Sequence, residues 1–270
     1  MHSVFAQVLA EYPRFRTAVT PEPGAVAVTV SELATPERLA AAIAACERLF
    51  ALGDARWAGQ LWWFSFNNSM VAPAVTAMVD CYRVPSLDLS AGALHVQPGD
   101  YWYSFSTDIV AADGAWREAG AEYAASITPL IDALTTAAGV KPAPLWAVAA
   151  DALVGAAVAA GNEAFDPYRG VHIACELSEG FAAGASAAAS SGAKAPTIPK
   201  PRFEDVRDGV MVPTDVAAAR AGEEPDGEVH TVARRASCCM IYRSPVAEMC
   251  VSCPKQDPAE RRAGTIAYVQ

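Results

Sequence analysis

Four of the chain's seven cysteines lie close together near its C-terminal end, in the sequence RRASCCMIYRSPVAEMCVSCPK. They are Cys238, Cys239, Cys250 and Cys253. Cysteine thiolates are soft ligands that bind zinc and iron–sulfur clusters. No secretory leader is recognisable at the N-terminus, so we expect a reducing compartment, where grouped cysteines are more often metal ligands than disulfides. The spacing therefore predicts a metal centre with four thiolate ligands.

The spacing leaves two kinds of centre open. Cys250 and Cys253 form a C-x-x-C pair, which can hold one ion on two sulfurs from a tight turn. Cys238 and Cys239 are adjacent, so in an extended segment their side chains start on opposite faces. Closing both on one tetrahedral zinc would need local distortion, whereas a two-iron cluster separates the ligand positions. Chemistry alone favours a [2Fe–2S] cluster and keeps structural zinc as the alternative.

The pattern C-C-x10-C-x2-C near a C-terminus resembles the ferric-siderophore reductases of the FhuF type. The RR before the cysteine pair, the IYR after it and Pro254 after the last cysteine are also similar to that family. Upstream, only Trp57 and the sequence PLWAVAADAL give looser similarity. The resemblance implies a [2Fe–2S] cluster held by Cys238, Cys239, Cys250 and Cys253.

The resemblance also implies an activity: one-electron reduction of Fe(III) in a hydroxamate-type siderophore inside the cell, with release of Fe(II). Coordination chemistry is consistent with this, because hard oxygen ligands hold Fe(III) far more tightly than Fe(II). Two other functions stay open at this point. The chain could be a zinc-stabilised binding protein, or an iron–sulfur electron carrier or sensor without a siderophore substrate.

Basic residues concentrate around the cysteines. Between residues 234 and 262 there are six basic and three acidic residues, whereas the whole chain has a formal net charge of -10. An iron–sulfur cluster with four thiolates is anionic, so Arg234, Arg235 and Arg243 are candidates for supporting it or for binding an anionic substrate. A solvated basic surface is the simpler alternative. The acidic balance of the chain argues against a nucleic-acid partner.

The residues that contact the siderophore are harder to predict. Tyr101 and Trp102 are the first candidates, in an aromatic segment that the alternation of polar and apolar residues predicts to be a strand. Aromatic residues at such spacing are more often core residues than a ligand platform. The same caution applies to the other candidates, which are Trp62, Trp63, Tyr103 and His95. We interpret His95 and His172 as structural histidines and Cys46, Cys81 and Cys175 as small core residues.

The electron source is expected to be another protein. The sequence has no G-x-G-x-x-G after a predicted strand and no Walker A sequence. Nicotinamide transfers hydride, so it would need a flavin to feed a one-electron cluster. A small one-electron donor of the ferredoxin or flavodoxin type is the simpler hypothesis.

The sequence predicts a helix-rich α+β fold. Alternating residues and turn signals between residues 86 and 110 predict two or three antiparallel strands. Capping and apolar spacing predict helices over residues 35–52, from about 54 to an interruption at Pro73, and over 115–138, 143–160 and 167–184, with Gly139 and Gly161 as end signals. VPTDVAAARAG predicts a short capped helix, and GEVHTVARRA a strand that leads into the cysteines.

Composition suggests three parts. Residues 1–184 are expected to form the helix-rich domain, residues 185–202 a Ser-, Gly- and Pro-rich linker, and residues 203–270 the C-terminal iron–sulfur segment. The most apolar stretch, LWAVAADALVGAAVAAG, contains Asp151 and is short for a membrane span, so we expect a buried helix and no integral membrane span. The predicted location is the cytoplasm.

Overall fold

The computed structural model describes residues 3–189 and 195–269 of the chain. Its α-helices are α1 (Ser3–Glu11), α2 (Arg16–Val19), α3 (Val30–Leu33), α4 (Pro36–Phe50), α5 (Ala55–Asp80), α6 (Trp116–Ala138), α7 (Pro142–Glu163), α8 (Pro167–Ala188), α9 (Val216–Ala221) and α10 (Pro258–Val269). Its strands are β1 (Val26–Val28), β2 (Arg83–Pro85), β3 (Ala93–Val96), β4 (Tyr103–Ser106), β5 (Val110–Ala112), β6 (Phe203–Arg207), β7 (Val210–Pro213) and β8 (His230–Ala233). The predicted α+β class is confirmed.

Helix ends follow the capping signals of the sequence. Thr35 caps α4 by accepting a hydrogen bond from the backbone N–H of Arg38, and Pro36 occupies the first turn. Gly139 ends α6 in the left-handed conformation, at φ 66°, where glycine has no steric penalty. Gly161 does not end α7, which continues to Glu163. Its missing side chain has a packing role instead, because a Cβ there would lie 2.8 Å from the Cα of Gly170 on α8.

The predicted interruption at Pro73 is wrong. Helix α5 runs without a break through Pro73, which is buried. A proline inside a helix removes one backbone hydrogen bond and costs about 3 kcal/mol. Large buried side chains on both sides of it, among them Phe66, Met70 and Met78, offset that cost by keeping the whole helix in the core.

The strands form three small antiparallel sheets. The expected strands pair as β3 with β4, and β1 joins them to give the order β1-β3-β4. β2 pairs with β5, and a third sheet has the order β7-β6-β8. β8 is the strand that was expected to lead into the cysteines. The sequence analysis did not predict β1, β2, β6 or β7.

A buried polar network joins the third sheet to the helices. The Asp205 carboxylate on β6 is fully buried and accepts hydrogen bonds from the hydroxyls of Thr214 (2.7 Å) and Thr231 (2.8 Å). Asn162 on α7 bonds both the N–H and the carbonyl oxygen of Thr231. Because buried polar groups need specific partners, this network fixes the position of β8 on α7.

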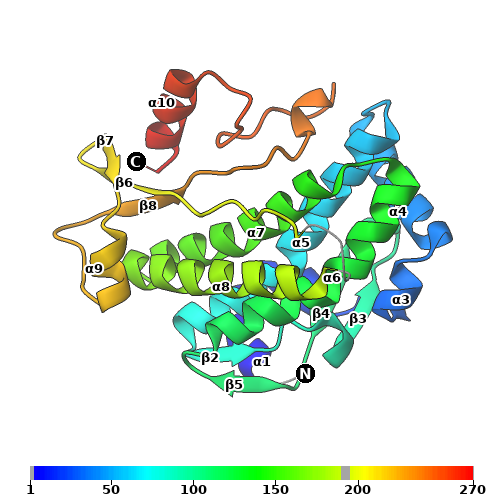
Figure 1. Cartoon of the computed structure of the whole chain (residues 1–270), viewed down its shortest axis with the longest axis horizontal. Coiled ribbons are helices and arrows are strands. Elements are labelled where there is room, and N and C mark those ends of the chain that lie inside the picture. The colour runs from blue at the N-terminus through cyan, green and yellow to red at the C-terminus, as the bar shows by residue number, and fades with distance from the viewer. Residues whose placement is uncertain (1–2, 190–194, 270) are drawn as a thin grey trace.

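Helix α7 lies between α5 and α8 at the centre of the molecule (Figure 1). Among the described residues it is the helix that is long and apolar enough to cross a membrane. However, 61% of that apolar stretch is buried inside the protein, as in a core helix. The expected buried helix is confirmed.

The C-terminal residues pack against the helical body. Helix α8 continues to Ala188, past the expected start of the linker at residue 185, and part of that linker lies outside the described residues. Phe203, Ala219 and Cys239 belong to the same apolar core as the long helices. The division into domains stays a prediction.

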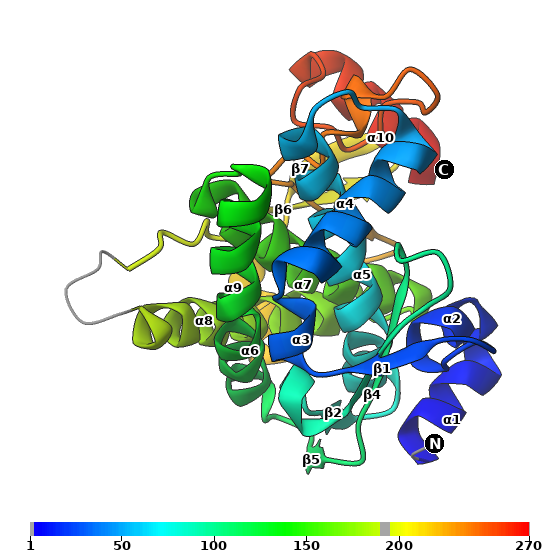
Figure 2. The ribbon, with the colours of Figure 1, turned by 90° about the vertical axis from the view of Figure 1, so that its right-hand side faces the viewer.

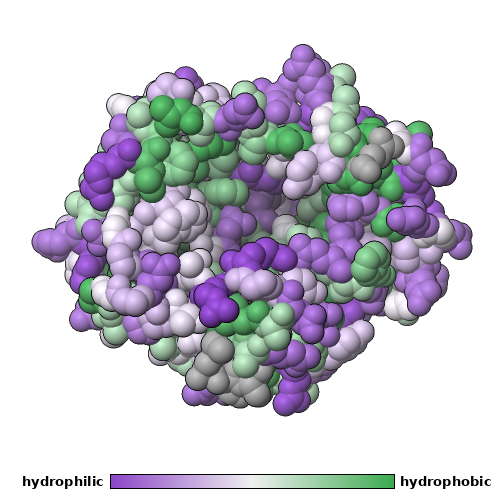
Figure 3. Space-filling view, turned by 180° about the vertical axis from the view of Figure 1, so that it is seen from behind, coloured by the Kyte–Doolittle hydropathy of each residue, from purple (hydrophilic) through white to green (hydrophobic). Residues whose placement is uncertain are grey.

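Helices α1 and α10 lie at opposite ends of the molecule (Figure 2). Seen from behind, the surface mixes hydrophilic and hydrophobic patches, and it is hollowed near its middle (Figure 3).

Candidate metal centre

A carboxylate in the middle of α7 anchors the segment that carries the first two cysteines. Asp151 accepts hydrogen bonds from the backbone N–H of Ala236 (3.1 Å) and from both the N–H (2.7 Å) and the hydroxyl (2.5 Å) of Ser237. Burial raises the pKa of Asp151, and these hydrogen bonds oppose that shift. The carboxylate therefore fixes the backbone immediately before Cys238.

Two further contacts hold the segment after this anchor. Gln60 on α5 donates to the carbonyl oxygen of Cys238 at 2.7 Å. The hydroxyl of Ser244 donates to the carbonyl oxygen of Phe50, at the end of α4, at 2.6 Å. Between them Met240 has a left-handed backbone at φ 71°, and its N–H donates to the Cys238 sulfur at 3.4 Å. The chain thus turns sharply straight after the cysteine pair.

The second cysteine pair sits on a tight turn of its own. The N–H of Cys253 donates to the carbonyl oxygen of Cys250 at 3.0 Å, and Gln256 closes the turn by donating its side-chain N–H to the same oxygen at 3.1 Å. This is the geometry that a C-x-x-C pair needs to present two sulfurs on one side.

The structure brings the four thiols together. Cys239 and Cys253 are buried, and Cys238 and Cys250 are half-buried. The Cys250 thiol donates to the Cys239 sulfur, which lowers the pKa of Cys239. Burial raises the pKa of Cys238, and the nearby Cys239 and Cys253 also act on it electrostatically. The four thiols thus lie within electrostatic range of one another.

Arg235 is the charged group closest to the thiols. Its Nη1 donates to the Cys250 sulfur at 3.5 Å, and its guanidinium lies over the Phe64 ring at 4.6 Å. Its Nε and Nη2 atoms are buried and have no hydrogen-bond partner within the described part of the chain. Buried donors of this kind normally have partners, so they indicate a site built around an anionic group.

Arg234 and Arg243 contact residues other than the cysteines. Arg234 pairs with Glu204 on β6, at 3.7 Å, and Arg262 on α10 shares the same carboxylate at 2.6 Å. Arg243 stacks on the ring of Trp57, with its guanidinium carbon 4.7 Å from the ring centre. Of the three arginines expected to support the cluster, Arg235 is therefore the one in contact with a cysteine.

The residues present fit an iron–sulfur cluster. The donor set is four thiols, and the half-buried guanidinium of Arg235, with two unpartnered nitrogen atoms, would offset the negative charge of their ligated form. Among the described residues, no three or more Cys, His, Asp or Glu side chains are grouped as they would be around a single ion.

Comparison with known families decides between the two centres. Residues 235–255 match the family model described as the FhuF 2Fe-2S C-terminal domain. This segment resembles the C-terminal domain of FhuF, and we call it the FhuF-type domain. The expected [2Fe–2S] cofactor and the expected family resemblance are confirmed, and the zinc alternative is set aside. A search of curated proteins finds no match to the chain.

Cys46, Cys81, Cys175, His95 and His172 lie outside residues 235–255. Cys46 and Cys175 are buried and Cys81 is half-buried against the core, as expected for small core residues. His172 packs edge-on against Trp116. His95 lies on β3, and its Nδ1 atom is buried without a partner in the described part of the structure, so it is not a fully hydrogen-bonded histidine.

The aromatic candidates for siderophore contact are mostly core residues. Trp62, Trp63 and Tyr103 are buried and pack with Phe66. Tyr101 is also buried, and its hydroxyl hydrogen-bonds Ser65.

Of these candidates Trp102 is the exception, because 51% of its surface is exposed. It packs edge-on against Tyr101. Neither residue lines the large cavity beside Cys250.

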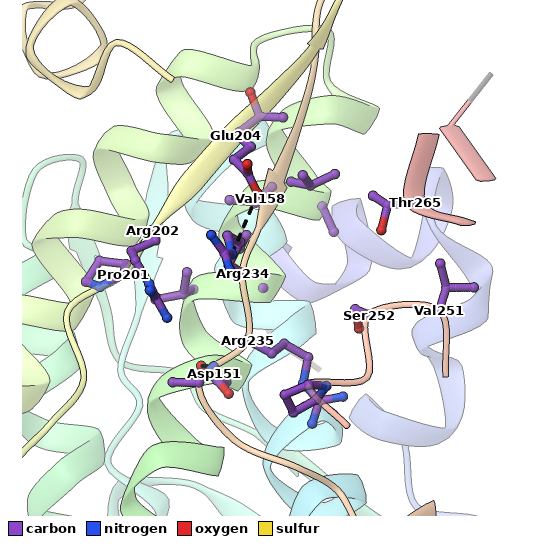
Figure 4. A pocket seen from close by; sticks show the side chains of 18 of the residues that line it. Asp151, Val158, Pro201, Arg202, Glu204, Arg234, Arg235, Val251, Ser252 and Thr265 are labelled. Atoms are coloured by element: carbon purple, nitrogen blue, oxygen red, sulfur yellow. Dashed lines mark hydrogen bonds and ion pairs between the residues drawn. The ribbon is translucent and has the colours of Figure 1, made fainter. Parts of the chain in front are cut away.

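That cavity has a volume of about 960 Å³. Helix α7, strands β6 and β8, the Cys250–Pro254 turn and helix α10 surround it (Figure 4). The sequence analysis did not predict β6 and α10, which form part of its walls. The excess of basic residues between 234 and 262 was the one usable signal, since four of these residues line the cavity: Arg234, Arg235, Arg261 and Arg262.

The four grouped cysteines are predicted to be the cluster ligands. Cys250→Ser should abolish or strongly weaken cluster binding, because a serine oxygen is a harder ligand than a thiolate. The measurement is visible absorption of purified protein together with iron and sulfide analysis. Cys81→Ser is the matched control and should retain the cluster. Loss of the cluster in Cys81→Ser, or its retention in Cys250→Ser, would contradict the assignment.

Arg235 is predicted to raise the reduction potential of the cluster more than Arg234 does. Arg235 contacts Cys250, whereas the charge of Arg234 is shared with Glu204. Removing a nearby positive charge disfavours the more anionic, reduced state. Arg235→Gln should therefore lower the potential clearly and Arg234→Gln only slightly, in a spectroelectrochemical titration. Equal shifts in the two variants would show that distance from the thiols does not matter.

Asp151 is predicted to hold the cysteine segment in place. Asp151→Ala leaves two backbone N–H groups and one hydroxyl without their acceptor, which should cost about 3 kcal/mol of unfolding free energy and speed cluster loss. Asp132→Ala, at an exposed position of α6, is the control. Denaturant unfolding and the decay of visible absorption measure the two effects. Identical values for the two variants would rule out the anchoring role.

Proposed function

We propose that this protein is a cytoplasmic ferric-siderophore reductase that delivers one electron to chelated Fe(III) and so releases Fe(II). The observation that carries the proposal is the FhuF-type domain at residues 235–255, which contains all four grouped cysteines. We also propose that Cys238, Cys239, Cys250 and Cys253 hold the cluster. The resemblance implies a hydroxamate-type siderophore as substrate.

Reduction of chelated Fe(III) requires the protein only to bind the chelate and to deliver one electron. When bound, a [2Fe–2S] cluster supplies one electron at a time. Substrate Fe(III) takes up that electron and becomes Fe(II), which hard oxygen ligands bind much more weakly. The organic ligand is not changed, so no general base or nucleophile is required.

The protein's own residues then have three tasks. Asp151 and Gln60 hold the backbone of the cysteine pair, so the donor position is fixed before substrate arrives. Arg235 sets the local charge around the thiols. Cys250 lies on the wall of the large cavity, which brings the donor position next to a space wide enough for a bulky chelate.

We further propose that the electron comes from a small one-electron protein of the ferredoxin or flavodoxin type. The basis is the absence from the sequence of recognisable dinucleotide fingerprints. A basic surface around the FhuF-type domain in an acidic chain would favour docking of an acidic donor.

The test is turnover by chemically reduced protein. One electron per cluster should pass to a ferric siderophore, measured as reoxidation of the visible spectrum and as Fe(II) trapped by a ferrous chelator. NADPH alone should not support the reaction, whereas NADPH with a ferredoxin or flavodoxin system should. A reduced cluster that stays reduced with every ferric siderophore would leave an electron carrier or sensor as the function.

A further inference from the structure

We propose that the cavity beside Cys250 is the binding site for the ferric chelate, and that it selects chelates with a net negative charge. This inference rests on the proposed function, and it moves the preferred substrates from neutral hydroxamate complexes to anionic chelates. Its basis is the position of the cavity, its size and the charges of its walls.

The position and size suit a chelate. Cys250, Ser252 and Pro254 line one side of the cavity, so an occupant lies directly against the turn that carries the second cysteine pair. Val251 and Ser252 mark this turn in Figure 4. A volume of about 960 Å³ is at the upper end of the range for small-molecule sites, roughly 300–1,000 Å³. Phe64 and Val158 contribute apolar surface that an organic ligand backbone can contact.

The walls carry more positive than negative charge. Six basic side chains line the cavity: Lys200, Arg202, Arg234, Arg235, Arg261 and Arg262. Asp151, Glu163 and Glu204 are the acidic lining residues. In a chain with a formal net charge of -10, this local excess is opposite in sign to the rest of the protein.

The acidic residues are already engaged. Asp151 accepts the hydrogen bonds of Ala236 and Ser237, and Glu163 pairs with Arg14. Glu204 is shared by Arg234 and Arg262.

Several of the basic side chains, by contrast, are free to meet a ligand. Within the described ranges, Lys200, Arg202 and Arg261 form no ion pair with a protein carboxylate. The charges available to an occupant are therefore positive, and low-dielectric walls concentrate their field in the cavity.

Chelates differ in the charge that they present to such walls. Three hydroxamates neutralise Fe(III), so a simple tris-hydroxamate complex carries no net charge. Catecholates and hydroxycarboxylates bring more negative charge than the metal, so their complexes are anions. The lining favours these complexes, and it favours hydroxamate siderophores only where they carry extra carboxylates.

Ga(III) complexes test binding without reduction, because Ga(III) takes up no electron under these conditions. Equilibrium dialysis of the oxidised holoprotein should compare a trianionic tris-catecholate Ga(III) complex with a neutral tris-hydroxamate Ga(III) complex. We expect the trianion to bind at least about tenfold more tightly at low salt, and its advantage to shrink as salt rises. Equal affinity, or an advantage that salt does not change, would overturn the proposal.

Variants that change single charges test whether the trianionic complex binds in the cavity. Arg261→Gln and Arg202→Gln should each weaken binding of the trianion by roughly threefold to tenfold and leave the neutral complex unaffected. Glu204→Gln should strengthen it, because Arg234 and Arg262 lose their competing carboxylate. Lys255→Gln removes the same charge beside the cysteines but outside the cavity lining, and it should change neither affinity. Equal effects of Lys255→Gln and Arg261→Gln would refute the cavity as the site.

The readouts separate this proposal from the proposed function. Charge-selective binding of Ga(III) complexes, without electron transfer from the reduced protein to any ferric chelate, would support the site and reject the reductase. Electron transfer to neutral and trianionic ferric chelates at the same rate, with no charge-selective Ga(III) binding, would support the reductase and reject the inference.

Discussion

The cysteine site depends on one half-buried carboxylate in a largely apolar helix. Asp151 lies in the middle of α7, where a charged group is costly unless its hydrogen-bonding capacity is used. Three donors from Ala236 and Ser237 use it. The cost of burying the carboxylate is thus offset only when the segment before Cys238 is docked on α7, so helix and cysteine segment are energetically linked.

Two other hydrogen-bond contacts position β8 and the cysteine segment relative to the Asp151 carboxylate. Asn162, three turns further along α7, holds the edge of β8, and Gln60 on α5 holds the carbonyl of Cys238. The guanidinium of Arg235 contacts both the Phe64 ring on α5 and the Cys250 sulfur. Its place beside the sulfurs is therefore determined by the helices as much as by its own segment.

Sequence analysis correctly predicted the features that depend on residues close together in the chain. The four cysteines and their flanking residues identified the metal centre and its family, because the ligands are close together in sequence. Thr35 and Gly139 marked helix ends through hydrogen bonds made within one or two turns. Pro73 was misjudged because tertiary packing outweighed a local helix-breaking preference.

The cavity could not be predicted in the same way. Its walls come from α5, α7, β6, β8 and α10, which meet only through long-range packing. Glu204 gives no sequence signal at all, since its importance lies in the two arginines that share it. In the sequence, Asp151 was recognisable only as a charged residue within an apolar stretch. Its role could not be predicted, because its hydrogen-bond partners lie more than eighty residues away in the chain.

The docking on α7 limits how far the site can be treated as a module. A peptide of residues 235–255 contains all four thiols, but it lacks Asp151, Gln60 and the carbonyl of Phe50. Grafting the motif onto another protein would therefore transfer the ligands without the groups that orient them. A host scaffold would need a helix with a carboxylate that accepts hydrogen bonds from the backbone before the first cysteine pair. It would also need a neighbouring helix with an amide side chain that donates to the carbonyl oxygen of the first cysteine. The recognisable stretch of sequence is thus shorter than the unit that could be inherited or engineered as a working site.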